Sequence, residues 1–284
     1  MNEIQSIQVS THGAELQSLV SNGLEYLWQG NPAYWKRRAP ILFPIVGRLA
    51  NDTLRIDGRE HTMTQHGFAR DVVFVHRDGK YVLVEDGHRG NYPYAFELVA
   101  EYSVQGNTLV CDWKVTNHDD KTMYFQIGAH PAFLLPDFNV ADEIHGYIQC
   151  YDAHDEIVSP MVFNYLENGL RVHYGQPKVL LNNEGILALT NTTFADDAIL
   201  LEGNQIASAA LFDKNGRKVL TVTCPQADAF GIWASSKPGC PFVCIEPWCG
   251  IADRCNFNGD ISERDCNHSL APGESFKFCY SLTI

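Results

Sequence analysis

The chain has 284 residues, of which 45% are hydrophobic and 11% aromatic, so it has ample material for a large core and too much for a disordered protein. Its formal net charge of −13, without a long run of Lys or Arg, argues against a nucleic-acid or anionic-membrane partner, because phosphate binding requires a basic patch. Neither a signal peptide nor an apolar run of ~20 residues is evident, so we expect a cytoplasmic protein.

The first distinctive segment runs from Ala39 to Arg48. Pro40 and Pro44 bracket a short apolar run and argue against an uninterrupted central strand. Gly47 allows close backbone approach just before Arg48. Arg48 is therefore either a surface charge on an aliphatic stem or a planar donor directed into a cleft.

Strand signals dominate the rest of the chain. Apolar and polar residues largely alternate over 108–116, the pattern of a half-buried strand. Similar β-rich runs occupy 81–85, 96–102 and 218–223. Several turn signals lie between such runs, as antiparallel hairpins require. These signals are Asp57-Gly58, Asp78-Gly79, Gln105-Gly106, residues 117–120 and Asn215-Gly216.

Helical signals are weak throughout. Residues 164–170 could form at most a short turn of helix, and alternating βα units are missing, which argues against a Rossmann-type or α/β-barrel fold. The sequence shows no low-complexity linker and no internal repeat. We predict an all-β protein in which residues 1–284 form a single large antiparallel domain.

Three segments, far apart in sequence, combine a titratable side chain with Gly, Pro or aromatic neighbours. They carry His66, His130 and Glu246. A histidine exchanges protons near neutral pH, and a carboxylate in an apolar wall can act as a base. Glu246 lies in an almost wholly apolar run, so it must be paired, hydrogen-bonded or raised in pKa, and Pro247 favours an extended backbone there. His66 taken alone also fits a hydrogen-bonded structural histidine.

Aromatic side chains beside these residues suit the faces of a sugar-binding cleft. Phe68 follows His66, Phe133 follows His130, and Trp248 follows Glu246. We expect all three aromatic side chains to line the cleft.

Metal binding is the less favoured interpretation of the same residues. His66, His130 and Glu246 are a common ligand set, but no two of them are spaced at i, i+2 or i, i+4. Nine cysteines are present, and four cluster without forming the two short pairs of a zinc motif. We expect buried, reduced thiols, no metal and no cofactor. The clustered cysteines are Cys240, Cys244, Cys249 and Cys255.

Four motifs together resemble the aldose 1-epimerases (galactose mutarotases), and most of all their LacX-type branch. They occur in the order that the family shows. The motifs are Ala39-Pro-Ile-Leu-Phe-Pro-Ile-Val-Gly-Arg48, Gln65-His-Gly-Phe-Ala-Arg70, Gly128-Ala-His-Pro-Ala-Phe133 and Cys244-Ile-Glu-Pro-Trp-Cys-Gly-Ile-Ala-Asp253.

The resemblance implies a large antiparallel β-sandwich with an open sugar-binding cleft. It implies that Glu246 is the general base on the anomeric hydroxyl and His130 the general acid on the ring oxygen. His66 then matches the second family histidine, near the ring oxygen, and Arg48 the arginine that contacts sugar hydroxyls. A sugar-binding aspartate is expected within 195–199; we favour Asp197, and Asp196 remains an alternative.

The resemblance further implies an isomerase that interconverts the α and β anomers of a hexose, with galactose or glucose as the expected small-molecule partner. The chain would act as a monomer or homodimer. A non-catalytic carbohydrate-binding protein is one alternative. Glycoside hydrolysis would use Asp197 with Glu246 as its two carboxylates but leaves His130 unexplained.

A hexose-6-phosphate mutarotase is a further alternative, and it depends on the arginines. Several lie near the motifs in sequence, and two or more in the cleft would suit a phosphorylated sugar, because the guanidinium fork matches phosphate. If Arg48 is the only arginine in the cleft, free hexoses should be the better substrates. The other candidates are Arg37, Arg38, Arg70 and Arg254.

Overall fold

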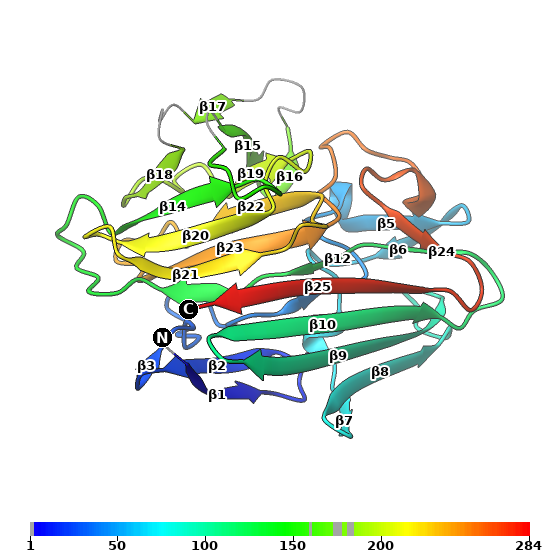
Figure 1. Cartoon of the computed structure of the whole chain (residues 1–284). Helices are drawn as coiled ribbons and strands as arrows, with labels where there is room; N and C mark the ends of the chain where they lie inside the picture. The colour runs from blue at the N-terminus through cyan, green and yellow to red at the C-terminus, as the bar shows by residue number, and fades with distance from the viewer. Residues whose placement is uncertain (1–2, 159–160, 173–177, 181–184) are drawn as a thin grey trace.

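The computed structural model describes residues 3–158, 161–172, 178–180 and 185–284. Within these ranges the fold is a β-sandwich of two nine-stranded antiparallel sheets, accompanied by smaller sheets and three short 3-10 helices. In Figure 1 the first large sheet lies in front, and β22 and β23 of the second sheet pass behind it. The all-β antiparallel fold expected from the sequence is confirmed.

The first sheet has the strand order β18-β14-β20-β21-β25-β10-β9-β8-β7. Every β-rich run expected from the sequence lies in it, and hairpins at Asp78-Gly79, Gln105-Gly106 and Asn215-Gly216 join neighbouring strands. Its strands are β7 (Val75–Arg77), β8 (Lys80–Asp86), β9 (Ala95–Gln105), β10 (Thr108–Asn117), β14 (Gly146–Tyr151), β18 (Ile186–Leu189), β20 (Ser208–Asp213), β21 (Lys218–Thr223) and β25 (Ser275–Thr283).

The second sheet has the order β16-β15-β19-β22-β23-β12-β4, with β13 paired to β23 and β17 to β15. Its strand β4 is two residues long and lies between Pro40 and Pro44, as the sequence predicts. The strands are β4 (Ile41–Leu42), β12 (Ile127–Ala129), β13 (Ala132–Leu134), β15 (Met161–Glu167), β16 (Leu170–Arg171), β17 (Lys178–Leu180), β19 (Ile199–Glu202), β22 (Ala229–Trp233) and β23 (Phe242–Cys249).

Smaller elements complete the described part of the fold. A three-stranded sheet consists of β1 (Ile4–Val9), β2 (Leu16–Ser21) and β3 (Leu24–Glu25). One two-stranded sheet consists of β5 (Thr53–Ile56) and β6 (Arg59–Thr62), and the other of β11 (Met123–Phe125) and β24 (His268–Leu270). The 3-10 helices are η1 (Ala50–Asp52), η2 (Ala69–Asp71) and η3 (Ile261–Glu263).

Residues 164–170, for which the sequence allowed at most a short turn of helix, form no helix. The segment is a β-hairpin in which β15 and β16 pair across Asn168 and Gly169. Both turn residues have positive φ, 52° and 78°, as a primed two-residue turn requires. Asn-Gly is a strong hairpin signal, and it outweighs the weak helical character of the preceding residues.

The hydrophobic core lies between the two sheets. Trp113 and Phe278 project into it from the first sheet and stack with ring centroids 5.3 Å apart, and Phe230 and Ile245 belong to the same buried cluster from the second sheet. Successive side chains of a strand point to opposite faces. Ile245 of β23 therefore faces the core, whereas Glu246 and Trp248 project from the opposite face of the second sheet.

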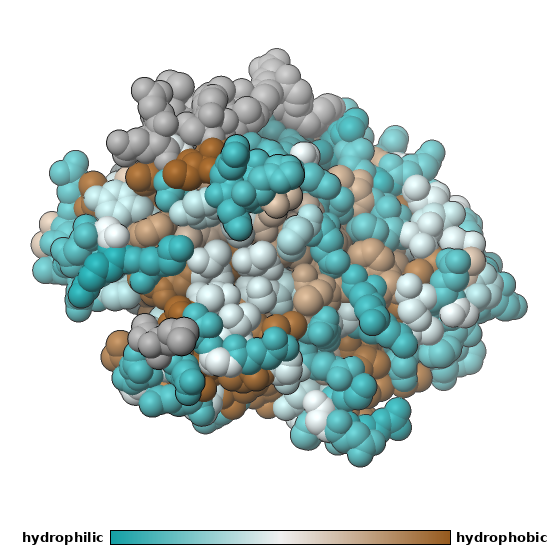
Figure 2. All heavy atoms as spheres, viewed as in Figure 1, coloured by the Kyte–Doolittle hydropathy of each residue, from teal (hydrophilic) through white to brown (hydrophobic). Residues whose placement is uncertain are grey.

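Hydrophilic and hydrophobic residues are interspersed over the outer face of the first sheet (Figure 2). Among the described residues, no helix has the length and apolar character needed to cross a membrane.

Candidate active site

A cleft of about 400 Å³ opens over the face of the second sheet that carries Glu246. This volume suits a small-molecule site. Six of the eight residues expected in the cleft line it: Arg48, His66, His130, Asp197, Glu246 and Trp248. Arg70, a candidate from the sequence, also lines the cleft, and residues that the sequence analysis did not select complete the lining: Trp35, Gln65, Leu166, Asn168, Gly169, Ala198 and Trp233.

The expectation that Phe68 and Phe133 line the cleft is wrong. Both rings are buried in the core cluster between the sheets. Phe68 packs near Tyr92, with ring centroids 6.2 Å apart, and the guanidinium of Arg89 lies 4.2 Å from its ring centre. Proximity to His66 in sequence did not place Phe68 in the cleft, because neighbouring side chains can point to opposite sides of the backbone.

Two glycines make room for the indole of Trp248 on the cleft floor. Gly128 of β12 pairs with Trp248, and Gly231 of β22 pairs with Glu246. A Cβ on Gly128 would lie 2.8 Å from the indole, and one on Gly231 would lie 2.9 Å from it. The indole therefore spreads over the backbone of both neighbouring strands, where only glycine leaves the space.

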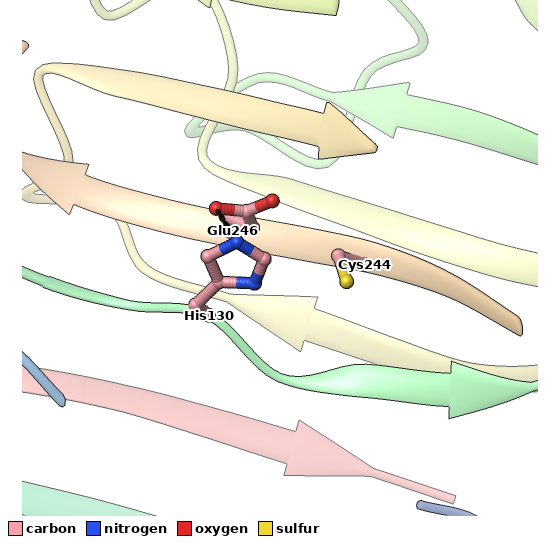
Figure 3. A group of neighbouring side chains, drawn as sticks. All are labelled: His130, Cys244 and Glu246. Atoms are coloured by element: carbon pink, nitrogen blue, oxygen red, sulfur yellow. Dashed lines mark ion pairs between the residues drawn. The ribbon is translucent and has the colours of Figure 1, made fainter. Parts of the chain in front are cut away.

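His130 and Glu246 form a buried pair at the cleft floor. His130 lies between β12 and β13, and its Nε2 is 3.2 Å from Oε2 of Glu246. Figure 3 shows the ring edge turned toward the carboxylate, with the Cys244 sulfur to one side. His130 is 6% exposed and Glu246 2% exposed, so bulk water has little access to either group.

Burial disfavours charge on both members of this pair. It raises the pKa of Glu246 well above its ordinary value; the nearby indole N–H of Trp248 opposes the rise, and the charge of Asp197 adds to it. Burial, assisted by Arg70 and Arg37, lowers the pKa of His130 to about 3. Burial therefore favours the uncharged pair, a protonated carboxyl beside a neutral imidazole.

His66 is fixed in one tautomer by its hydrogen bonds with Gly47. The backbone N–H of Gly47 donates to the ring Nδ1 of His66 over 3.1 Å. The backbone N–H of His66 donates in return to the Gly47 carbonyl over 2.8 Å. Nδ1 is thus an acceptor, and the ring proton resides on Nε2. Burial and the charge of Arg70 hold the pKa of His66 well below its ordinary value, so this imidazole is a neutral hydrogen-bond donor.

Gly47 and Gly67 are required on either side of this contact. Both have φ of 70°, a conformation that favours glycine. A Cβ on Gly47 would lie 2.4 Å from that of Ala252, and one on Gly67 would lie 2.2 Å from the Phe43 carbonyl oxygen. This packing brings the two sequence motifs around positions 47 and 66 into one rigid corner of the cleft.

Tryptophans that the sequence analysis missed enclose His130. The Trp35 ring stacks on the imidazole with centroids 4.6 Å apart and planes at 25°, and Trp233 meets it edge-on at 5.9 Å. Trp35 precedes the 39–48 motif by a few residues, the only signal in the sequence for its position. A lone tryptophan is more typical of a core, so that signal is weak.

Arg48 satisfies both interpretations offered by the sequence. It lines the cleft, while its side chain remains 39% exposed. Its Nε and Nη2 donate to the two carboxylate oxygens of Asp52 over 2.9 and 3.0 Å, and Nη1 donates to the Asn168 carbonyl over 3.2 Å. The guanidinium is therefore oriented by a bidentate ion pair.

Asp197, and not the neighbouring Asp196, lines the cleft; Asp196 is exposed. Asp197 has φ of 136°, a strained value for a residue with a side chain. Its carboxylate accepts hydrogen bonds from the N–H groups of Gly169, at 3.1 Å, and Ala198, at 2.7 Å. These two hydrogen bonds hold the backbone of Asp197 in its strained conformation and orient its carboxylate toward the cleft.

Arg70 is a second arginine of the cleft, so Arg48 is not alone there. Its Nη2 donates to the Gln65 carbonyl, and Arg37 donates to the carbonyl of Arg70 over 3.2 Å. Burial and the nearby Arg37 lower the pKa of Arg70 to about 10. The other two candidates lie elsewhere: Arg38 bonds to Gln17, and Arg254 pairs with Asp265.

A metal-ligand set in the cleft differs from the one considered from the sequence. His130, Cys244 and Glu246 place one ligand atom each within 4.8 Å of one another (Figure 3). All nine cysteines are free thiols. The cluster suggested by Cys240, Cys244, Cys249 and Cys255 does not form, because Cys244 and Cys249 lie on opposite faces of β23 and Cys255 is exposed.

The sequence and structure both match known mutarotase relatives. The model of the aldose 1-epimerase family matches residues 2–283. The chain is 30% identical to the plasmid-encoded protein LacX of Lactococcus lactis subsp. lactis, over all of this chain and 97% of that protein. A galactose mutarotase related enzyme from Lactobacillus acidophilus is 32% identical with a TM-score of 0.87, over 100% of this chain and 95% of that one.

A galactose mutarotase-like protein from Lactobacillus casei ATCC 334 is 25% identical with a TM-score of 0.88, over 99% of this chain and 98% of that one. The family match covers almost the whole chain, and each of the four sequence motifs contributes at least one residue to the lining of the cleft. The chain belongs to the aldose 1-epimerase family.

Proposed function

We propose that this protein is a mutarotase that interconverts the α and β anomers of an aldohexose by acid–base ring opening. The observation that carries the proposal is the His130–Glu246 pair, 3.2 Å apart and buried at the floor of a sugar-sized cleft. A base and an acid held together beside a bound hexose are what the reaction requires.

The Glu246 carboxylate takes the proton from the anomeric hydroxyl. The C1–O5 bond breaks, the ring oxygen receives a proton from His130, and the anomeric oxygen becomes the aldehyde oxygen. Rotation about C1–C2 turns the other face of the aldehyde toward O5. Ring closure then reverses both proton transfers and leaves Glu246 and His130 as they began.

The number of protons that His130 and Glu246 hold together is compatible with this cycle. Catalysis begins with the proton on His130 and the charge on Glu246, whereas burial favours the uncharged arrangement. The two arrangements contain the same number of protons, and transfer across the 3.2 Å contact converts one into the other. Hydrogen bonds from a bound sugar and from Trp248 would stabilise the charged carboxylate at the moment of reaction.

The remaining cleft residues bind and orient the sugar. The Nε2–H of His66 is available as a donor near the ring oxygen, because its Nδ1 is occupied by Gly47. Arg48 and Asp197 supply a donor and an acceptor for hydroxyls. Trp248 provides an apolar surface for a sugar face, since sugar C–H groups pack on aromatic rings.

Polarimetry tests the proposal. Freshly dissolved α-D-galactose and α-D-glucose should approach anomeric equilibrium faster in proportion to enzyme concentration. The control is the protein inactivated by heat. If calorimetry shows sugar binding but no aldose is accelerated, the cleft is a carbohydrate-binding site without catalysis, and the proposal fails.

Arg70 supports a second candidate, mutarotation of a hexose 6-phosphate. Besides burial, the charge of Arg37 lowers the pKa of Arg70 and that of Asp71 opposes this effect, so a phosphate would relieve the part of the like-charge repulsion that Asp71 leaves. Arg48 is already paired with Asp52, and the Nε of Arg70 lies 3.9 Å from the Asp71 carboxylate, so both arginines of the cleft have an anionic partner and the free hexose is our first choice.

The ratio of kcat/KM for galactose 6-phosphate and galactose separates the two candidates. A ratio well above one that falls at least ~10-fold in Arg70→Gln assigns the phosphate to Arg70, since a charged hydrogen bond contributes about 1.5–3 kcal/mol. The matched control is Arg77→Gln on the exposed strand β7. A ratio below one in the unchanged protein supports the free sugar.

A further inference from the structure

Three side chains meet at the edge of the sandwich, outside the residues that line the cleft. Asp228 directly precedes β22, Cys249 ends β23 and His268 begins β24. Each places one ligand atom within 4.8 Å of the other two, and Nε2 of His268 lies 3.3 Å from Oδ2 of Asp228. A carboxylate, a thiol and an imidazole are the donors that zinc prefers.

The backbone and packing hold these side chains in place. The Asp228 N–H donates to the Trp248 carbonyl over 2.8 Å, and the Cys249 thiol donates to the Gln226 carbonyl over 3.3 Å. His268 pairs with Phe125 in the β11–β24 ladder, and its ring packs against Phe276 with centroids 4.6 Å apart. An ion would therefore find three donors already ordered, with little conformational entropy left to lose.

The spacing and access also suit a cation. Tetrahedral zinc with bonds of about 2.0–2.3 Å separates its ligand atoms by roughly 3.3–3.8 Å, so the His268–Asp228 contact already has the required length. The side chains of His268 and Asp228 are 26% and 24% exposed, which opens a route from solvent to the buried Cys249.

The local electrostatics favour a positive ion. The Asp228 carboxylate supplies negative charge close to the Cys249 thiol. A divalent cation held between them would stabilise the thiolate form of Cys249.

We propose that Asp228, Cys249 and His268 form a zinc site, with water at the fourth position. Binding replaces the Cys249 S–H bond with a thiolate–zinc bond, and the proton passes to solvent. The ion would join the end of β23 to β24 and to the residue before β22. Since β23 carries Glu246 and Trp248, the site stabilises the floor of the cleft from behind.

The set formed by His130, Cys244 and Glu246 is the competing location. All three residues are buried, and a zinc ion there would occupy the acid and base of the proposed reaction. Cys244 and Cys249 are both buried thiols of β23 on opposite faces, so they provide a matched pair of variants.

Metal titration of chelator-treated protein tests the site. Cobalt(II) should give a thiolate-to-metal charge-transfer band at one equivalent, and zinc should displace it. Cys249→Ser should abolish the band and weaken zinc binding at least ~100-fold, because even outer groups that support a ligand contribute 10–100-fold. Cys244→Ser should keep both. At a zinc concentration 100 times Kd, the melting temperature should rise about 5 °C.

His268→Gln provides a second variant if Cys249→Ser does not fold, because His268 is partly exposed and its loss opens no large cavity. It should remove the zinc-dependent rise in melting temperature. A band that survives Cys249→Ser and disappears in Cys244→Ser would place the ion in the cleft and overturn the proposal. So would the lack of any band in the unchanged protein. Mutarotation is not a readout here, so failure of the zinc site is distinguishable from failure of the proposed function.

Discussion

Glu246→Gln should make the protein more stable and far less active at neutral pH. Glutamine keeps the shape and hydrogen-bonding reach of the side chain but removes its basicity. General-base catalysis contributes about 10²–10⁴-fold, so kcat should fall ~100-fold or more with little change in KM. That pattern identifies an interaction made mainly in the transition state.

The stability gain follows from the direction of the pKa shift. Because the folded pKa of Glu246 lies above the ordinary 4.5, the unfolded chain loses this proton first as pH rises. Between the two pKa values the folded state therefore loses about 1.4 kcal/mol of stability per pH unit relative to the unfolded state. Glutamine has no such penalty. The melting temperature of the variant should gain about 3–6 °C over the unchanged protein for each pH unit in this window.

Calorimetric or fluorescence melting from pH 4.5 to 8 measures this difference, and polarimetry measures the rate. Glu143→Gln, at an exposed position outside the cleft, is the control and should change neither. Near-normal mutarotation in Glu246→Gln would refute the assignment of the base. A stability difference that does not grow with pH would show that an ion pair with His130 outweighs burial.

Four further outcomes are expected. The kcat/KM should not change with pH around pH 6.5. Inactivation by acid requires the His130–Glu246 pair to take up a second proton, on His130, whose pKa is about 3. A decrease in kcat/KM below about pH 6.5 would contradict this prediction. Gly231→Ala should raise KM and cost roughly 1–3 kcal/mol in denaturant unfolding, because its Cβ would lie 2.9 Å from the Trp248 indole; Gly90→Ala, with open space around it, is the control. His66→Asn should lower kcat less than His130→Asn does, and equal losses in steady-state assays would assign His66 to proton transfer. Chelation with EDTA should leave the polarimetric rate unchanged; a loss restored by a divalent ion in both the unchanged protein and Cys249→Ser would place a metal at His130 and Glu246.

Local sequence predicted four of the nine strands of the first sheet: β8, β9, β10 and β21. Alternation over 108–116 predicts β10, and the β-rich run at 218–223 has the bounds of β21, because each is half-buried and its period-two pattern is imposed by a single buried face. The hairpin at 164–171 was missed although Asn168-Gly169 signals it. There the turn chemistry was decisive and the flanking pattern was weak.

The sequence also identified three titratable residues of the cleft. His66, His130 and Glu246 were selected because titratable groups in Gly, Pro and apolar settings are unusual, and the structure brings them into one cleft. Their roles in catalysis remain proposals. The choice between Asp196 and Asp197 needed the structure, because adjacent residues point in different directions and only the fold shows which one faces the cleft.

Only the tertiary structure decided which aromatic rings form the cleft and which groups share a proton. Phe68 and Trp35 each lie near a motif in sequence, yet Phe68 packs in the core and Trp35 stacks on His130. The 3.2 Å contact between His130 and Glu246 and the opposite shifts of their pKa values depend on burial by strands distant in sequence. A linear sequence specifies side chains and local backbone preferences, whereas desolvation is a property of the completed packing.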